Sequence, residues 1–110
     1  MSSVAYVQEA ELESLLTENK LVVLDCTATW CGPCKMVSPS MDKLSAEYEG
    51  TAKVVKLDVD DNRNVAKQLG IRSIPTVIFF KDGEQVETIV GVVPYEKFST
   101  VLSGMVSSTL

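Results

Sequence analysis

Histidine is absent from this chain of 110 residues, and only three residues are cysteine. A closed zinc site needs four cysteine or histidine ligands, so the composition disfavours a zinc-binding module. A secreted framework built on disulfides would leave one of the three thiols unpaired. We therefore expect the protein to work in a reducing compartment, either the cytoplasm or a reducing organelle.

Basic residues are also few, with 10 Lys and Arg against 15 Asp and Glu and a net charge of -5. The chain thus lacks the basic footprint of a nucleic-acid-binding protein and the polybasic patch of a membrane-binding protein. No apolar run is long enough to cross a bilayer, and residues 1–16 lack the basic and apolar regions of a signal peptide. These absences predict a soluble protein that binds neither nucleic acid nor membranes.

Repeats and linkers are missing as well, and 110 residues are enough for one domain with a core but not for two. We expect a single domain over residues 1–110. Apolar periodicity and turn residues predict strands over residues 4–7, 21–26, 53–59, 76–80 and 85–90. Helices are predicted over residues 9–18, from the cysteine pair to Gly50, over residues 62–69, and from Pro94 onward.

The predicted order of elements is β-α-β-α-β-α-β-β-α. Alternating strands and helices give parallel strand pairs, and Asp82-Gly83 between the last two strands predicts an antiparallel hairpin. We therefore expect an α/β fold in which four helices flank a central five-stranded mixed sheet on both faces.

Two cysteines three residues apart, in Cys31-Gly32-Pro33-Cys34, follow a predicted buried strand and precede a predicted helix. Cys31 is expected at the helix N-terminus, where unpaired N–H groups and the helix dipole favour an anion. A cysteine so placed is more acidic, and its thiolate is the reactive form. The second thiol at this spacing can close a small disulfide ring with the first.

Two charged residues interrupt apolar strands. Asp25 lies in a run of Val, Leu and Cys, so we expect it to be buried, with its pKa raised and its proton exchangeable near neutral pH. The alternative is an exposed aspartate at the end of a strand. Lys56 would need a carboxylate neighbour inside the sheet, for which Asp25 is the candidate. The alternative is a lysine whose stem packs while its amine reaches solvent.

Three further residues have two interpretations each. Trp30, just before the cysteine pair, is expected to be partly exposed, although a core tryptophan is the alternative. Gly91 follows a strand. It either allows another backbone segment to approach closely or only ends the strand. Cys26 is expected to be a small buried hydrophobe, and a regulatory thiol is the alternative.

Taken together, these motifs resemble the thioredoxin family over essentially the whole chain. The resemblance rests on residues 22–25, Trp30-Cys31-Gly32-Pro33-Cys34-Lys35, residues 56–60, residues 70–76 with Ile74-Pro75-Thr76, residues 80–83 and Gly91. A lone pair of cysteines would be a weak signal, whereas this ordered set is specific. It implies the thioredoxin fold.

The resemblance also implies roles for individual residues. Cys31 would attack a disulfide of a target protein, and Cys34 would resolve the mixed disulfide. Asp25 would accept the proton of Cys34 through water, with Lys56 paired to it. The peptide bond before Pro75 would be cis, which leaves the backbone of the preceding residue free to pair with an extended substrate. The implied docking surface consists of Trp30, Gly32, Pro33, Ile74, Pro75, Gly91 and Val92.

The implied activity is that of a redox-active electron-transfer protein and protein-disulfide reductase. It would need no cofactor or metal of its own, and we expect it to be a monomer. A thioredoxin reductase dependent on NADPH or on ferredoxin would return it to the dithiol form. Two departures from the family leave partner preference open: Thr27 stands where many members have an aromatic residue, and Cys26 replaces what is often a bulky apolar one.

Two rival functions use the same fold. The first is a disulfide oxidant or isomerase, but such relatives usually carry a histidine between the cysteines, and this chain has Gly32-Pro33 there. The second is a structural subunit or chaperone-like binder that has lost the redox step. The presence of both cysteines, Asp25 and Pro75 favours the reductase over this alternative.

Overall fold

A computed structural model describes residues 4–107, and its elements follow the predicted order. The strands are β1 (Ala5–Tyr6), β2 (Leu21–Thr27), β3 (Lys53–Asp58), β4 (Thr76–Lys81) and β5 (Glu84–Val90). The helices are α1 (Glu9–Glu18), α2 (Gly32–Glu47), α3 (Arg63–Gln68) and α4 (Tyr95–Ser107). The expected mixed sheet of five strands with four helices is therefore confirmed.

The sheet has the strand order β1-β3-β2-β4-β5, which places β2 at its centre. β2 runs parallel to β3 and antiparallel to β4, and β4 pairs antiparallel with the edge strand β5. All seven residues of β2 are buried. Burial on both faces explains why its sequence is a nearly continuous apolar run and why Asp25 within it is conspicuous.

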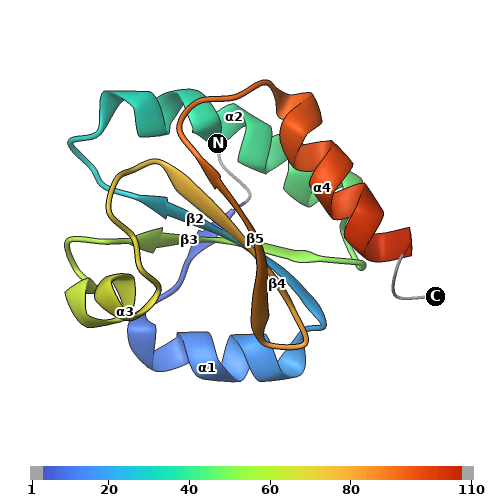
Figure 1. Cartoon of the computed structure of the whole chain (residues 1–110), viewed down its shortest axis with the longest axis horizontal. Coiled ribbons are helices and arrows are strands. Elements are labelled where there is room, and N and C mark those ends of the chain that lie inside the picture. The colour runs from blue at the N-terminus through green and yellow to red at the C-terminus, as the bar shows by residue number, and fades with distance from the viewer. Residues whose placement is uncertain (1–3, 108–110) are drawn as a thin grey trace.

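The side chains of β2 alternate between the two faces of the sheet. Val23 packs in the core with residues of α2 and α4, whereas Leu24 and Cys26 pack in the core on the side of α1. Figure 1 shows α2 and α4 on one side of the sheet and α1 and α3 on the other. By this alternation Asp25 projects toward the α2 side, and Cys26 projects away from it.

The predicted hairpin joins β4 to β5. Asp82 and Gly83 both have positive φ angles, of 53° and 82°, and Lys81 pairs with Glu84 across the turn. Two left-handed residues match the right-handed twist of the flanking strands, which is why Asp-Gly is favoured at this position. Within residues 4–107, none of the helices is long and apolar enough to cross a membrane.

Candidate functional site

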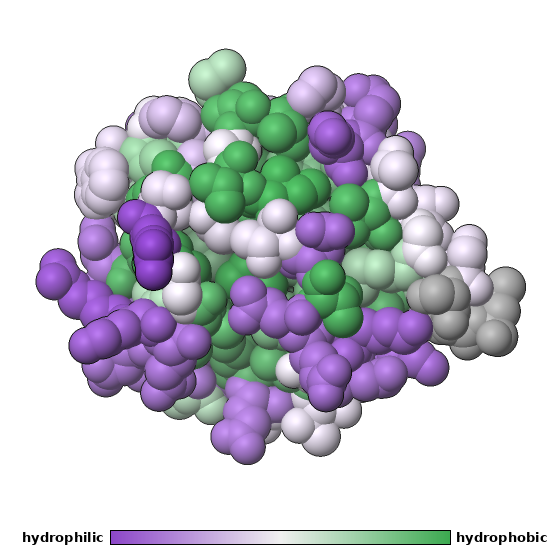
Figure 2. Space-filling view, viewed as in Figure 1, coloured by the Kyte–Doolittle hydropathy of each residue, from purple (hydrophilic) through white to green (hydrophobic). Residues whose placement is uncertain are grey.

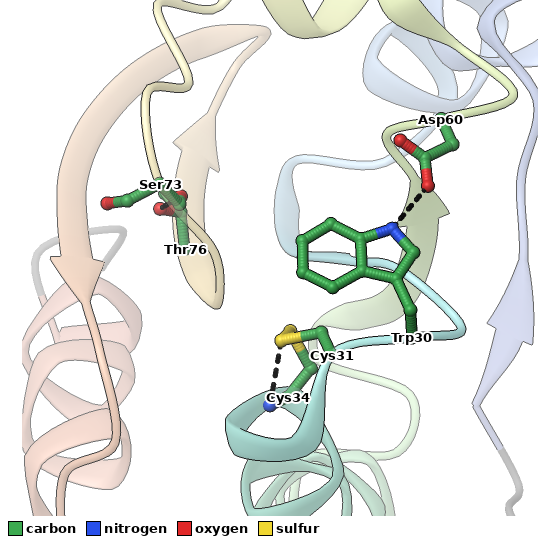
Figure 3. The surroundings of a disulfide bond; sticks show 6 residues. All are labelled: Trp30, Cys31, Cys34, Asp60, Ser73 and Thr76. Atoms are coloured by element: carbon green, nitrogen blue, oxygen red, sulfur yellow. Dashed lines mark hydrogen bonds between the residues drawn. A yellow bond between two sulfur atoms is a disulfide. The ribbon is translucent and has the colours of Figure 1, made fainter.

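The cysteine pair lies where β2 ends and α2 begins. Cys31 is the N-cap of α2, Pro33 is the second residue of the helix, and Cys34 follows in the first turn. Proline is tolerated there because the first N–H groups of a helix have no intrahelical acceptor. A disulfide joins Cys31 to Cys34, whose Cα atoms lie 5.3 Å apart. Figure 3 shows this ring between Trp30 and the loop at Ser73 and Thr76.

A hydrogen bond distinguishes the two sulfur atoms. The backbone N–H of Cys34 donates to Sγ of Cys31 at 3.2 Å, and the same contact is drawn in Figure 3. This N–H is one of the donors that the start of a helix leaves unpaired, and the positive end of the helix dipole acts at the same point. Both effects favour negative charge on the Cys31 sulfur over the Cys34 sulfur when the pair is reduced.

Burial does not distinguish the two cysteines in this disulfide form. Each has 3% of its surface exposed. The position of Cys31 at the N-cap of α2 therefore does not make it more exposed than Cys34 in the oxidised protein. The two cysteines form one small buried cluster with Ala28, and Val59 and Ile74 pack against it.

Asp25 is buried, with 1% of its surface exposed, so the alternative of an exposed strand end is excluded. Burial raises the pKa of Asp25 to about 6, and the positive charge of Lys56 opposes part of this rise. Within residues 4–107, its Oδ1 atom is buried without a hydrogen-bond partner. Asp25 is thus a carboxyl group that gains or loses a proton near neutral pH, on the face of the sheet covered by α2.

Lys56 lies directly beside Asp25 in the register of β3 and β2 and is only 7% exposed. Lys56 is therefore largely buried, which argues against a stem that packs while the amine extends into solvent. Its Nζ donates a hydrogen bond of 2.7 Å to Oγ of Ser38, in α2, and lies 5.8 Å from the ring centre of Tyr6. The direct partner of Lys56 is therefore a hydroxyl that the sequence does not single out, although Ser38 stands one helical turn after Cys34.

Trp30 is 68% exposed, as expected, and a hydrogen bond holds its ring. Its Nε1 donates to Oδ2 of Asp60 at 2.6 Å (Figure 3). The backbone N–H groups of Asp60 and Asp61 donate to Oδ1 of Asp58, which orders the turn after β3. The sequence does not predict this role of Asp60, because nothing in the spacing of residues 58–61 points to a tryptophan about thirty positions earlier.

An apolar groove of about 400 Å³ opens beside the disulfide. Trp30, Cys31, Pro33 and Ile74 line it, together with Val59 and Ile71 among others. The fold thus brings together residues from the two segments that the sequence marks as a docking surface. Gly32 lies beside them, exposed at the first position of α2.

The remaining residues of the expected docking surface lie around Pro75. The Ile74–Pro75 peptide bond is cis, as expected, and Pro75 is buried. The N–H of Gly91 donates to the carbonyl of Pro75 at 2.9 Å. Gly91 has a φ of 91°, a left-handed backbone conformation that explains why a glycine stands at this position. Val92 is 46% exposed. Figure 2 shows hydrophobic residues gathered over the upper part of β5 and its connection to α4.

Cys26 is the third cysteine, and it is fully buried in the core on the α1 side of the sheet. Burial raises the pKa of its thiol, and the charge of Asp25 raises it further. The structure thus supports the expected small hydrophobe. Across residues 4–107, no group of three or more Cys, Asp or Glu side chains is arranged to hold a metal ion.

Replacing Asp60 with alanine should loosen the Trp30 ring. A hydrogen bond of this kind contributes about 1 kcal/mol, so KM for a protein disulfide should rise about fivefold, while reduction of a small disulfide is unchanged. Trp30 is the single tryptophan of the chain, so its emission spectrum and anisotropy report on this ring alone. The exposed neighbour Asp61 is the matched control. Equal effects of Asp61→Ala, or an unchanged emission in Asp60→Ala, would rule out the contact as the cause.

Comparisons with known proteins agree with this geometry. The thioredoxin family model matches residues 3–103. Thioredoxin of Pyropia yezoensis is 46% identical over 106 residues, which cover 96% of this chain and 99% of that protein. Thioredoxin of a Synechocystis species is 47% identical over 103 residues, covering 93% and 96% of the two chains.

A solved structure shows the same fold. A mutant thioredoxin from Halobacterium salinarum superposes with a TM-score of 0.83 at 35% sequence identity, covering 92% of this chain and 88% of that one. The family match, together with the adjacent cysteine pair, supports a thiol–disulfide oxidoreductase function. A redox-active disulfide at the start of α2, on this sheet and with these relatives, places the chain in the thioredoxin family.

Proposed function

We propose that this protein reduces disulfides in other proteins and is then reduced again by a thioredoxin reductase. The observation that carries the proposal is the Cys31–Cys34 disulfide at the start of α2, in which Cys31 Sγ accepts the N–H of Cys34 beside an apolar groove. Of the two sulfurs, Cys31 has the better-stabilised thiolate, which makes it the attacking group.

The reaction proceeds by two exchanges. The Cys31 thiolate attacks one sulfur of the target disulfide, and the other target sulfur leaves as a thiolate that takes up a proton. Cys34 loses its proton and attacks Cys31 Sγ, which breaks the mixed disulfide and releases the second target sulfur. The target gains two electrons and two protons, and the Cys31–Cys34 disulfide is formed again.

Asp25 is the proposed acceptor of the Cys34 proton. It lies on the face of the sheet that α2 covers, and burial raises its pKa to about 6, which suits a group that exchanges protons near neutral pH. Lys56 acts through Asp25, because its positive charge limits how far the pKa of Asp25 rises. Both residues thus belong to the proton-transfer step.

The groove beside Cys31 is the proposed docking site for an extended segment of the target. Trp30, Pro33 and Ile74 offer it an apolar surface, and the backbone at Ile74 offers it hydrogen bonds, as in the addition of a strand. The proposed docking surface also includes Gly32, Pro75, Gly91 and Val92, of which Gly91 is hydrogen-bonded to Pro75. Docking of this kind orients the target disulfide toward the thiolate and so replaces a chance encounter.

The reductase that recharges the protein is dependent on NADPH or on ferredoxin. The Cys31–Cys34 pair of a disulfide reductase stays in its dithiol form only in a reducing compartment, so we propose the cytoplasm or a reducing organelle. We also propose that the protein acts as a monomer.

The test is reduction of a protein disulfide such as insulin, coupled to a flavoprotein reductase with NADPH or to a ferredoxin-linked reductase. We expect catalytic turnover with at least one of the two donors. The reduction potential of the pair, measured against glutathione, decides between reductase and oxidant. A potential near the about -120 to -180 mV of disulfide oxidants and isomerases would contradict the proposal.

A further inference from the structure

We propose that Ser38 is a positioning residue of the proton-transfer step: its hydroxyl holds the ammonium of Lys56 against α2 and so prevents Lys56 from forming an ion pair with Asp25. This inference rests on the proposed role of Asp25 as the acceptor of the Cys34 proton. It assigns a function to a side chain that touches neither the target nor the reacting sulfur atoms.

The contact between Lys56 and Ser38 is short and partly buried. Nζ of Lys56 donates to Oγ of Ser38 at 2.7 Å, Lys56 is 7% exposed, and Ser38 is half-buried. Ser38 stands four residues after Cys34 in α2 and therefore on the same side of the helix. The hydroxyl thus lies on the same side of α2 as the resolving cysteine, Cys34. On this side α2 faces the two charged strand residues, Asp25 and Lys56.

Asp25 is the competing acceptor for the ammonium. It is the cross-strand neighbour of Lys56, and within residues 4–107 its Oδ1 atom is buried without a hydrogen-bond partner. A buried ammonium and a buried carboxylate with free hydrogen-bonding capacity attract each other strongly. The hydrogen bond to Ser38 gives Lys56 a neutral acceptor instead, and Asp25 feels its charge without a direct contact.

Among residues 4–107, Asp25 Oδ1 is the only buried side-chain nitrogen or oxygen without a hydrogen-bond partner, whereas the other groups around Lys56 have contacts of their own. From β1, Tyr6 presents its ring to the ammonium. At the end of β3, Asp58 Oδ1 accepts two backbone N–H groups of the following turn. From α2, Asp42 is itself engaged in a contact, and the two cysteines are joined in the disulfide. β4 contributes an uncharged neighbour to Asp25, since the partner of Asp25 in that strand is Val77.

Removing the hydroxyl should therefore transfer Lys56 to Asp25. In Ser38→Ala the ammonium loses its acceptor in a largely buried site, and the unpartnered Oδ1 of Asp25 is the available replacement. An ion pair favours the charged carboxylate, so the pKa of Asp25 should fall from about 6. Asp25 would then be a weaker base for the proton of Cys34.

The titration of the Asp25 carboxyl carbon, followed by NMR in the oxidised protein, tests the inference directly. We expect the midpoint in Ser38→Ala to fall by about one pH unit, which is about tenfold in proton affinity. Ser38→Thr keeps a hydroxyl and should titrate as the wild type does, and Ser40→Ala, on another side of the same helix, should have no effect. A midpoint that is unchanged or raised in Ser38→Ala would overturn the inference.

A double-mutant cycle separates this effect from a general change in packing. In a Lys56→Met background there is no ammonium to move. The Asp25 midpoint should therefore be the same in Lys56→Met and in the double variant that also carries Ser38→Ala. An equal fall of the midpoint with and without the lysine would overturn the inference, because the hydroxyl would then act on Asp25 by another route.

The pH profile of insulin reduction distinguishes this inference from the proposed function. If Ser38→Ala lowers the Asp25 midpoint and the acid limb of the rate profile by the same amount, both stand. If the midpoint falls but the rate profile does not move, Ser38 still positions Lys56, and the role of Asp25 as proton acceptor is wrong. If the rate profile moves while the midpoint stays, the assignment of Ser38 is wrong.

Discussion

Replacing Cys31 with serine should abolish disulfide reduction, so that the rate with a protein substrate falls to the uncatalysed background. Serine is a poor nucleophile at neutral pH, and the sulfur that accepts the N–H of Cys34 is lost. No other thiol can take its place, because Cys34 lies in the first turn of the helix and Cys26 is buried on the other side of the sheet. Turnover of insulin with a reductase measures the loss.

The matched variants are Cys34→Ser and Cys26→Ala. Cys34→Ser keeps the attacking sulfur but cannot resolve the mixed disulfide, so it should accumulate covalent adducts with its targets in a lysate. Cys26→Ala removes a thiol from the same chain without touching the site, and its turnover should be close to that of the wild type. Adducts formed by Cys31→Ser and not by Cys34→Ser would reverse the assignment of the two cysteines.

Replacing Asp25 with asparagine should stabilise the oxidised protein at pH 7. Burial raises the pKa of Asp25 from 3.8 to about 6, and a shift of that size corresponds to about 3 kcal/mol of destabilisation when the carboxyl is charged. The neutral amide avoids this cost, so Tm should rise by on the order of 10 °C. The same variant should turn over slowly, since the proposed acceptor of the Cys34 proton is missing.

The sign of the pH dependence follows from the raised pKa. Between about pH 4 and pH 6 the folded protein holds the Asp25 proton more tightly than the unfolded chain does, so stability falls as pH rises through this window. Below it both states are protonated and the penalty vanishes. The advantage of Asp25→Asn over the wild type should therefore be large at pH 7 and nearly absent at pH 4.

Thermal or urea unfolding at the two pH values measures this difference. The control is Asp61→Asn, which removes the same charge from an exposed position and should change stability by less than about 0.5 kcal/mol. A gain of equal size at pH 4 and pH 7 would mean that the ionisation of Asp25 is not its cause.

Local patterns were enough to predict most of the fold. The helix over Glu9–Glu18 has the predicted bounds, and the continuous apolar run predicted β2 as a strand buried on both faces. The Asp82-Gly83 pair predicted the hairpin, since two left-handed residues are required there. These features depend on residues that are neighbours along the chain, which is why they can be predicted from the sequence.

The contacts that shape the site depend instead on strand register and helix placement. Lys56 bonds to Ser38 because β3 lies beside β2 under α2, and Trp30 bonds to Asp60 because the turn after β3 reaches the loop after β2. In both pairs the two residues are far apart in the sequence, so no helical or strand periodicity links them. The equal burial of Cys31 and Cys34 likewise depends on residues distant in the chain, since Val59 and Ile74 pack against them.

Alkylation of the fully reduced wild-type protein tests the central claim, that Cys31 is the attacking thiol. A limiting amount of iodoacetamide at neutral pH, followed by mass mapping of the peptides, shows which of the three thiols reacts first. We expect Cys31 to be labelled well before Cys34, with Cys26 last because burial raises the pKa of its thiol. Preferential labelling of Cys34 or Cys26 would contradict the account.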